Sequence, residues 1–424
     1  MRTYFLLITV IVMSTAASLA QNVYTLEGYR EMVVSNFPEH NNKQINREIS
    51  QLKTENIRTS YLPEIILNGQ ATYQSDVTSV DLPETLTSMG VDIEGVSNDQ
   101  YKAYVDVKQT IWDGGLKKAQ REIEALDLDG EQQKIDVEVH HLKRIADTYF
   151  FNVLLVRKSL DVLKLQNEVL AKQLERLQKS LKQGVVTQKD VLEFEVEQLK
   201  VEQKITQASM REKSLLSAMG VLAGTGFSSR DSFQLPEVDI VTDLANKRPE
   251  LQLFSLQQKQ IELSNSLLES ARNPKFFGFG QAGYGKPGLN MLKNEFDTYY
   301  LAGVGLKWEV FDWNETKRKK QMAQLNIEKV DLQKDDFLQQ QDMQLVQAKN
   351  EIEMQRQLVQ QDEKIVEMRH RITQTASSEL ENGAITSTDY LTDLNAETTA
   401  RINYEIHKIE WLKAQNDYKT LLGN

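Results

Sequence analysis

Two stretches of the chain alternate between apolar and polar residues and then change to a helical spacing. Residues 104–118 read YVDVKQTIWDGGLKK, and residues 303–317 read GVGLKWEVFDWNETK. Alignment of Asp113 with Asp312 gives an offset of 199 residues and places Trp112 on Phe311. Each stretch predicts a strand that runs directly into a helix, and its double occurrence predicts a duplicated architecture.

Two further pairs of segments support the duplication. Residues 181–192, LKQGVVTQKDVL, match residues 380–391, LENGAITSTDYL, at the same offset of 199. Residues 61–73, YLPEIILNGQATY, match residues 272–284, RNPKFFGFGQAGY, at an offset of 211. Because the second offset is larger by 12 residues, we expect a shorter loop between the two strands of the second half.

Four strands are predicted, at 64–74 and 101–112 in the first half and at 275–285 and 299–311 in the second. Their period of two places apolar residues such as Ile65, Leu67 and Tyr73 on one face and polar residues on the other. One such strand alone would favour a half-buried sheet in a soluble domain. Two pairs of such strands favour a transmembrane β-barrel, with the polar loops 75–100 and 286–298 outside the cell. Because four strands cannot close a barrel, and an open edge is prohibitive in lipid, we expect other copies of the chain to complete it.

Long helices are predicted in the two stretches that lack proline, 84–235 and 288–424. The first half has a helix over 25–60 with a break at Pro38, and then a helical hairpin over 113–219. The long arm of this hairpin covers about 105 Å at the rise of an α-helix. Its apolar residues follow a heptad spacing that predicts a coiled-coil seam: Val156, Leu160, Leu163, Leu170, Leu174, Leu177 and Leu181.

The second half repeats this plan. It has a helix over 244–271, where Pro249 takes the place of Pro38, and a hairpin over 312–420. In each hairpin a glycine ends the long arm and a Thr-x-x-Asp sequence begins the returning arm, as in a capping box. The predicted organisation is a signal peptide at 1–20, a first repeat at 21–223, a connector at 224–243 and a second repeat at 244–424.

Residues 1–20 have the pattern of a secretory signal peptide. Arg2 precedes an apolar run over residues 4–13, and Ser18-Leu19-Ala20 supplies the small residues of a cleavage site. The segment is too short to span a membrane as a helix, so we expect the mature chain to start near Gln21. No later segment has the length of apolar sequence that a transmembrane helix needs, and none is expected.

Composition narrows the class of function. The 424 residues carry a net charge of −11 and no cysteine, which leaves no means of forming disulfides or thiolate metal sites. An acidic chain without basic clusters speaks against a nucleic-acid partner. The carboxylates have no Ser, His or Cys companions in a catalytic pattern, so neither an enzyme nor a cofactor is predicted.

Two patterns resemble ligand sites but are interpreted as structural. Residues 278–283, GFGQAG, match the GxGxxG of nucleotide-binding folds, yet they lie inside a predicted strand and are not followed by a helix. We expect these glycines to make room for aromatic neighbours, namely Phe276, Phe277, Phe279 and Tyr284. No metal site is predicted, because adjacent histidines on a helix diverge and the others are isolated: His140 and His141, then His40, His370 and His407.

Taken together, these features resemble the TolC-like outer-membrane efflux factors over essentially the whole mature chain. The resemblance rests on IWDGG at 111–115, on the tip motif G-x-x-T-x-x-D at 184–190 and 383–389, and on Pro63 and Pro274 before the first strand of each half. The second half departs from this pattern, with Trp313-Asn314 where the first has Gly114-Gly115.

The resemblance implies a homotrimer in the outer membrane of a Gram-negative bacterium, with a 12-stranded β-barrel on a long periplasmic α-barrel. It implies a passive exit duct of a tripartite efflux or type I secretion system. The partners would be an inner-membrane pump and a periplasmic adaptor. The transported substrate stays open, because drugs, metal ions, proteins and siderophores all fit a duct.

Two sets of candidate site residues lie at the hairpin tips. The turns have apolar residues where solvent exposure is expected, which predicts contact with the adaptor: Gly184, Val185, Val186 and Thr187, and Gly383, Ala384, Ile385 and Thr386. The family resemblance implies that acidic residues in this region narrow the periplasmic entrance. Asp389 fits the tip motif and Asp393 lies one position late. Alternatively, Asp389 only completes a capping box with Thr386, and both aspartates complement the helix dipole.

A second class of function stays open at this point. A periplasmic coiled-coil adaptor, or a structural protein without a channel, would also contain long helical hairpins. An adaptor usually has one hairpin flanked by small β-domains, whereas this chain has two hairpins that each follow a strand pair. An enzyme is a more distant third class, because it would need a site that the sequence does not contain.

Overall fold

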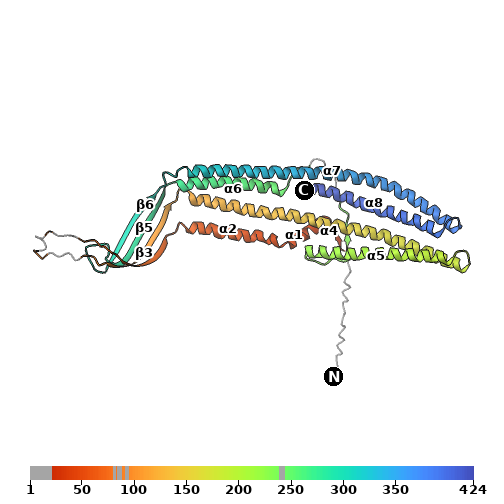
Figure 1. Ribbon diagram of the computed structural model, residues 1–424, viewed down its shortest axis with the longest axis horizontal. Coiled ribbons are helices and arrows are strands. Elements are labelled where there is room, and N and C mark those ends of the chain that lie inside the picture. The colour runs from red at the N-terminus through yellow and green to blue at the C-terminus, as the bar shows by residue number, and fades with distance from the viewer. Residues whose placement is uncertain (1–21, 80–82, 84–87, 91–94, 238–243) are drawn as a thin grey trace, which may run out of the picture. The chain divides into compact units, whose positions relative to one another are not determined.

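The computed structural model of the protein describes residues 22–79, 83, 88–90, 95–237 and 244–424. It is mainly helical, and one order of elements occurs twice (Figure 1). The predicted signal peptide and part of the predicted connector lie outside the described residues. In the part of the chain that is described, none of the helices combines the length and the apolar character needed to cross a membrane.

Each half contains a helical segment, a strand pair, a helix of 67 residues and a shorter returning helix. The first half consists of α1 (Leu26–Asn36), the 3-10 turn η1 (Pro38–Asn41), α2 (Asn42–Thr59), β2 (Glu64–Tyr73), β3 (Asp99–Trp112), α4 (Leu116–Lys182) and α5 (Gln188–Ala223). The second consists of α6 (Pro249–Arg272), β5 (Lys275–Lys286), β6 (Asp297–Lys307), α7 (Glu315–Glu381) and α8 (Ser387–Leu421). The short strands β1 (Val23–Tyr24) and β4 (Ser232–Phe233) form a parallel pair.

The two helices that precede the strand pairs differ, although a proline stands at the matching position in each. Pro38 follows the end of α1 and begins η1, so it separates α1 from α2 as predicted. Pro249 is instead the first residue of α6, and the helix predicted from residue 244 begins five residues later. Proline suits the first position of a helix because its missing N–H would have no partner there. The residue before it is disfavoured in helical conformation.

Strand β6 is shorter than predicted. It ends at Lys307, whereas the alternating sequence continues to residue 311. Lys307 pairs with Lys275, the first residue of β5, and the residue before that is Pro274, which has no N–H to donate. The ladder therefore ends where the partner strand begins.

The two corners between strand and long helix are closed by aspartate. The Asp113 carboxylate accepts hydrogen bonds from the backbone N–H of Gly115 (3.0 Å) and Lys117 (2.8 Å). Asp312 accepts the corresponding bond from Thr316 N–H (2.9 Å). Because these aspartates cap the helices from outside, α4 and α7 begin at Leu116 and Glu315, three residues after the predicted starts.

The residues after each aspartate have positive φ, but for different reasons. Gly114 has a φ of 74°, and a Cβ there would lie 2.5 Å from the Cβ of Asn273 at the end of α6. Asn273 also donates a hydrogen bond from Nδ2 to the Gly114 carbonyl oxygen (2.8 Å). Trp313 has a φ of 51°, and its side chain is 78% exposed. The second corner therefore has room for a side chain, and the first does not.

The described chain forms two compact units, and each unit takes matching parts from both halves. The hairpin unit consists of the residues up to Phe37, Val139–Asn246 and Met343–Asn424. The sheet unit consists of Pro38–Glu138 and Lys247–Asp342. All four strands of the large sheet therefore lie in one unit, and both hairpin tips lie in the other.

The large sheet has the order β2-β3-β5-β6, with every neighbouring pair antiparallel (Figure 1). The central pair joins β3 of the first half to β5 of the second. The register keeps the predicted apolar residues on one face: Leu67 lies opposite Val105, which lies opposite Ala282, which lies opposite Tyr300. Strands β2 and β6 are the two edges of the sheet within this chain.

Glycines and aromatic residues pair across strands on the opposite face. Phe279 lies opposite Gly303, and Phe277 lies opposite Gly305. A Cβ at Gly303 would lie 2.7 Å from the ring of Phe279, and one at Gly305 would lie 2.4 Å from the ring of Phe277. The glycines that make room for Phe277 and Phe279 therefore belong to β6, and not to the GFGQAG segment as predicted. The prediction failed because sequence periodicity does not specify which strand lies beside which.

Two apolar clusters stabilise the hairpin unit. One joins α1, α4, α5 and α8, and its most buried members are Tyr29, Val33, Phe150, Phe151, Val153 and Met219. The other, here called the tip cluster, joins α4, α5, α7 and α8: Leu170, Leu177, Val191, Phe194, Val201, Ala376, Tyr390, Leu391 and Leu394. Each large apolar side chain that is fully buried contributes about 1.5–3 kcal/mol. The predicted heptad seam of α4 supplies several buried residues, including Leu160 and Leu163.

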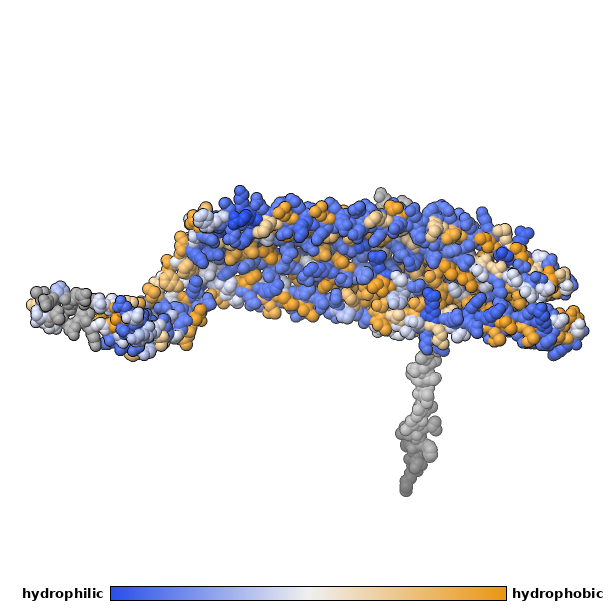
Figure 2. Space-filling view, viewed as in Figure 1, coloured by the Kyte–Doolittle hydropathy of each residue, from blue (hydrophilic) through white to orange (hydrophobic). Residues whose placement is uncertain are grey.

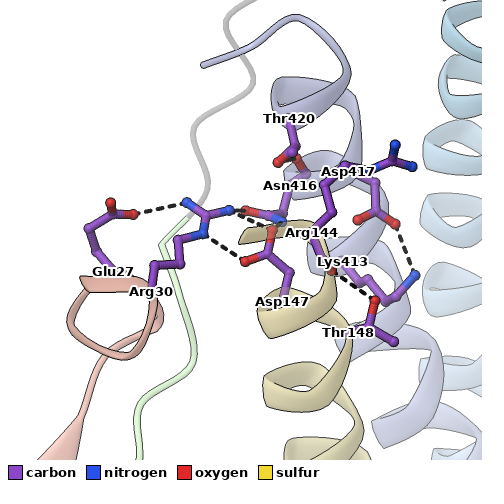
Figure 3. A network of polar contacts seen from close by, with 9 residues as sticks. All are labelled: Glu27, Arg30, Arg144, Asp147, Thr148, Lys413, Asn416, Asp417 and Thr420. Carbon is purple, nitrogen blue, oxygen red and sulfur yellow. Dashed lines mark hydrogen bonds and ion pairs between the residues drawn. The ribbon is translucent and has the colours of Figure 1, made fainter. Parts of the chain in front are cut away.

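A buried ion pair connects α1 to α4 and α8 (Figure 3). The Arg30 guanidinium donates to both carboxylate oxygens of Asp147, each at 2.6 Å, and to the Asn416 side-chain oxygen at 3.0 Å. Asn416 donates in turn to Asp147 (2.9 Å). Asp147 is 2% exposed, and its charge is neutralised within the cluster. Although burial lowers it, the hydrogen bonds and charge of Asp147 raise the pKa of Arg30 overall.

Candidate functional site

Both hairpin tips have the same backbone geometry. Gly184 (φ 73°) and Gly383 (φ 69°) follow the long helices in left-handed conformation. The N–H of the next residue reaches back into the helix, from Val185 to the Ser180 carbonyl (3.0 Å) and from Ala384 to the Glu379 carbonyl (2.8 Å). These bonds satisfy carbonyl groups at the end of the helix in the manner of a Schellman motif.

Each returning helix begins with a capping box. The Asp389 carboxylate accepts from the backbone N–H (3.0 Å) and the hydroxyl (2.7 Å) of Thr386, and the Asp389 N–H donates to the Thr386 hydroxyl oxygen (3.2 Å). Thr187 and Asp190 form the same box in the first hairpin. The hydrogen bonds from threonine lower the pKa of both carboxyl groups. The stabilisation of the folded state by these ionised carboxylates is fully present above the ordinary aspartate pKa. It is lost as the pH falls through the lowered pKa of the folded state.

The four apolar residues of the turns divide into two kinds. Val185 is 74% exposed, and Ala384 is also exposed. Val186 and Ile385 are half-buried and pack against the tip cluster. The prediction that all four would be exposed was therefore wrong for Val186 and Ile385. Those two extend the core, and Val185 and Ala384 are the apolar side chains that a partner would contact.

The two tips are linked directly to each other. The Ser387 hydroxyl donates to Asp190 (2.8 Å), and the Thr388 hydroxyl donates to Glu193 (3.0 Å). The rings of Phe194 and Tyr390 stack with centroids 5.9 Å apart and an interplanar angle of 14°. Sequence reasoning missed these contacts, because the matching positions of the two repeats give no indication that α5 lies beside α8.

Asp389 and Asp393 have different surroundings. Asp389 is exposed and lies in its capping box. Asp393 is half-buried, and its carboxylate lies 3.8 Å from the Arg369 guanidinium on α7. The charge of Asp393 is therefore partly offset within the chain, whereas Asp389 presents its charge to solvent. Of the two constriction candidates, Asp389 is therefore the more exposed and the less compensated.

A second polar group lies one to two turns further along α8. Glu397 is 7% exposed and accepts from Arg401 (2.7 Å), with the His370 Nδ1 at 2.9 Å. Burial raises the pKa of the Glu397 carboxyl, but the hydrogen bonds from Arg401 and His370 outweigh this and lower it overall. His407 similarly contacts Asp362 at 2.6 Å. These two histidines, expected to be isolated, each contact a carboxylate.

The residues described by the structure contain no cluster of three or more His, Cys, Asp or Glu side chains that could hold a metal ion. The GFGQAG segment lies within strand β5, whose neighbours are strands on both sides. Phosphate-binding glycines precede a helix, which this segment does not.

The two hypotheses for Asp389 and Asp393, that they narrow the entrance of a channel or that they only stabilise the start of a helix, predict different results. We expect Asp389→Asn combined with Asp393→Asn to shift the ion selectivity away from cations in planar-bilayer recordings, because an acidic ring favours cations. Thr386→Ala is the matched control, since it removes the capping hydroxyl and leaves both charges. If both variants only lower the thermal midpoint and leave selectivity unchanged, the cap explains Asp389 fully.

No family model and no curated protein matches the sequence. Solved structures do match its fold. Outer membrane protein VceC of Vibrio cholerae superimposes with a TM-score of 0.67 at 13% identity, over 94% of this chain and 96% of VceC. The Campylobacter jejuni CmeC outer membrane channel gives 0.65 at 15% identity, over 94% of this chain and 85% of CmeC. The open-state Neisseria gonorrhoeae MtrE outer membrane channel gives 0.67 at 13% identity, over 94% and 89%.

These matches extend over both halves of the chain and both of its units. They include the sheet, the two long hairpins and the order in which these follow one another. The chain therefore has the fold of outer-membrane channels, as its resemblance to the TolC-like outer-membrane efflux factors implies.

Proposed function

We propose that the protein is an outer-membrane exit duct of a tripartite efflux or type I secretion system. Three copies would close a 12-stranded β-barrel in the outer membrane and continue as an α-barrel in the periplasm. The duct would be a passive conduit that receives substrate from an inner-membrane pump through a periplasmic adaptor. One observation supports this most strongly: the sheet has four strands, an exposed apolar face and two unpaired edges.

The edges argue for closure by further copies. The outer strands β2 and β6 have a sheet neighbour on one side only. Every unpaired N–H and C=O in the hydrocarbon core costs several kcal/mol, about the full value of an unmade hydrogen bond. Edge-to-edge pairing of β6 from one copy with β2 from the next removes this cost. Three copies give an even, closed set of strands.

The faces of the sheet argue for lipid on one side. Leu67 is 78% and Val304 is 81% exposed on the face that the register makes apolar. The opposite face contains Lys102, Asp106 and Lys108 from β3. Apolar side chains that face outward and polar side chains that face the lumen are the pattern of transmembrane barrels.

Exposed apolar residues on the helices suggest where neighbouring copies meet. Figure 2 shows hydrophobic residues distributed among the polar ones over the helical surface. On α7 they recur along the helix as Met322, Leu325, Leu332, Met343, Val346, Met354, Ile365, Met368 and Ile372. On α5 they are Leu192, Val196, Leu199, Met210 and Val221. Exposed apolar side chains that recur along the length of a helix favour contact with other helices.

The alternative function, a periplasmic adaptor or structural coiled-coil protein, does not account for the sheet. A protein of that kind does not enter a membrane, so it would not need an exposed apolar face on the strands that precede each hairpin. Its hairpin tips would serve equally well for docking, so the tips alone do not separate the two proposals. The oligomeric state and the membrane fraction do.

We expect the protein to be a trimer. Native mass measurement of the detergent-solubilised protein from the outer-membrane fraction should give three chains, because three sheets are needed to close the barrel. The trimer should change mobility on heating, as closed barrels do when they unfold. A stable monomer with ordered strands would contradict the proposal, and a soluble periplasmic protein would favour the adaptor.

A further inference from the structure

The polar face of the sheet has an uneven distribution of charge. Strands β3 and β6 end, and β2 and β5 begin, where the sheet joins the long helices. At this end the polar face contains three lysines, Lys108, Lys275 and Lys307, here called the basic collar, and one carboxylate, Glu64. The collar and Glu64 together leave an excess of two positive charges in each chain.

Two of these lysines face each other directly. Lys275 and Lys307 are register partners in the β5–β6 ladder. Side chains at such positions have Cβ atoms about 5 Å apart, and like charges there are destabilising. No carboxylate oxygen in the described part of the chain lies within 4.0 Å of the Nζ of any lysine of the basic collar. The sheet therefore tolerates an uncompensated repulsion at this end.

The third lysine is held in place by an aromatic ring. The Lys108 Nζ lies 5.1 Å from the centroid of Phe277, a cation–π distance. Phe277 lies opposite Gly305, and its ring occupies the space that a Cβ at that position would fill. Phe277 is also two residues from Lys275 on the same face of β5. The ring thus brings the Lys108 charge toward the end of the sheet where Lys275 and Lys307 lie.

The other charged side chains on this face of the sheet, Lys102, Asp106 and Asp297, lie further from that end, and Glu309 lies outside the sheet, two residues past Lys307. The Asp106 carboxylate accepts hydrogen bonds from Asn68 (2.8 Å) and Gln281 (2.8 Å), so amide groups occupy both of its oxygens. Lys102 lies four residues before Asp106 on the same strand, so the two charges cancel in the sum over this face. Asp297 lies at the opposite end of β6. The positive excess is therefore confined to the end nearest the helices.

We infer that the basic collar is an anion-selective constriction of the channel. In the proposed trimer it would repeat three times around the lumen and place about six net positive charges at that end of the barrel. Rings of Lys or Arg select anions and phosphate groups in pores. The collar would favour the passage of solutes that bear carboxylate, sulfate or phosphate groups. This inference rests on the proposed function, since it requires the polar face to line a lumen.

The test compares two charge changes in planar-bilayer recordings. The triple variant Lys108→Gln, Lys275→Gln and Lys307→Gln should shift the reversal potential in a KCl gradient toward the K⁺ equilibrium potential. Glu64→Gln, at the same end of the sheet, should shift it in the opposite direction. Both proteins keep Asp389 and Asp393, so the tips contribute equally to each recording. Tripolyphosphate should block the wild-type channel reversibly and should block the triple variant less.

The outcomes separate the collar from the proposed function. Open channels whose reversal potential and tripolyphosphate block are the same in wild type and triple variant would overturn the collar alone. Absence of any conductance from the purified wild-type trimer would overturn the proposed function and the collar with it. If the triple variant does not form heat-modifiable trimers, Lys307→Gln at the end of β6 replaces it, with a smaller shift in the same direction.

Discussion

Charged residues at the two exposed apolar positions of the tips should abolish export while the trimer still assembles. We expect this of Val185→Asp combined with Ala384→Asp, because both side chains are exposed and make no contribution to the tip cluster. If these positions dock on the adaptor, two buried carboxylates per chain without partners would cost several kcal/mol each, about the penalty for an unpaired buried charge. Complementation of a strain that lacks the gene provides the measurement.

The neighbouring residues provide the control. Val186→Asp and Ile385→Asp change the half-buried positions that pack against the tip cluster. They should weaken the trimer itself, which is seen as a lower heat-modification temperature. The chain has no cysteine, so Val185→Cys also gives a unique site for cross-linking. Export that is unimpaired by the Val185 and Ala384 changes, with no adaptor cross-linked at position 185, would place the docking surface elsewhere.

Loss of the buried ion pair should have the largest effect on stability. We expect Asp147→Ala to lower the free energy of unfolding by about 3–5 kcal/mol, because it leaves the Arg30 guanidinium buried without its partner. The pair lies deep among α1, α4 and α8 (Figure 3), and Asn416 depends on it for one of its hydrogen bonds. Urea unfolding in detergent, followed by far-UV circular dichroism, measures the change.

Two variants test whether the buried partner is the cause. Glu27 contacts the same guanidinium at 2.9 Å, but its side chain is 62% exposed. Glu27→Ala should therefore cost less than about 1 kcal/mol, as surface ion pairs do. Replacement of both Arg30 and Asp147 by Met and Leu should recover much of the loss, since no charge is then left unpaired. Equal losses from Glu27→Ala and Asp147→Ala would show that burial does not determine the effect.

Local patterns of the sequence were sufficient to predict much of the fold. The alternation of apolar and polar residues over 64–74 predicted both β2 and its apolar face. This works because successive side chains of a strand point to opposite faces of the sheet, whichever strand lies beside it. The Thr-x-x-Asp sequences predicted the capping boxes at Thr187 and Thr386, since all of their bonds lie within four residues. The starts of the long helices were predicted three residues too early, because the sequence alone does not distinguish an aspartate that caps a helix from one inside it.

Features that depend on distant partners could not be predicted in this way. Arg30, Asp147 and Asn416 are separated by more than a hundred residues at each step, and nothing near any one of them indicates the other two. The side chain of Val186 packs against the tip cluster, whereas that of Val185 is exposed. This difference depends on the left-handed turn at Gly184 and on the packing of the second hairpin beside the first. The basic collar likewise exists only through the register of four strands.

The corner at Gly114 shows that the two halves of the chain have become complementary rather than equivalent. A gene duplication would have begun with two identical copies. The carbonyl of Gly114 now accepts a hydrogen bond from Asn273 of the second half. The residue at the corresponding place in the first half, by the offset of 211, is Leu62, which has no amide to donate. At this corner the first half therefore depends on a contact that its own sequence does not supply, and one polypeptide keeps the two halves together.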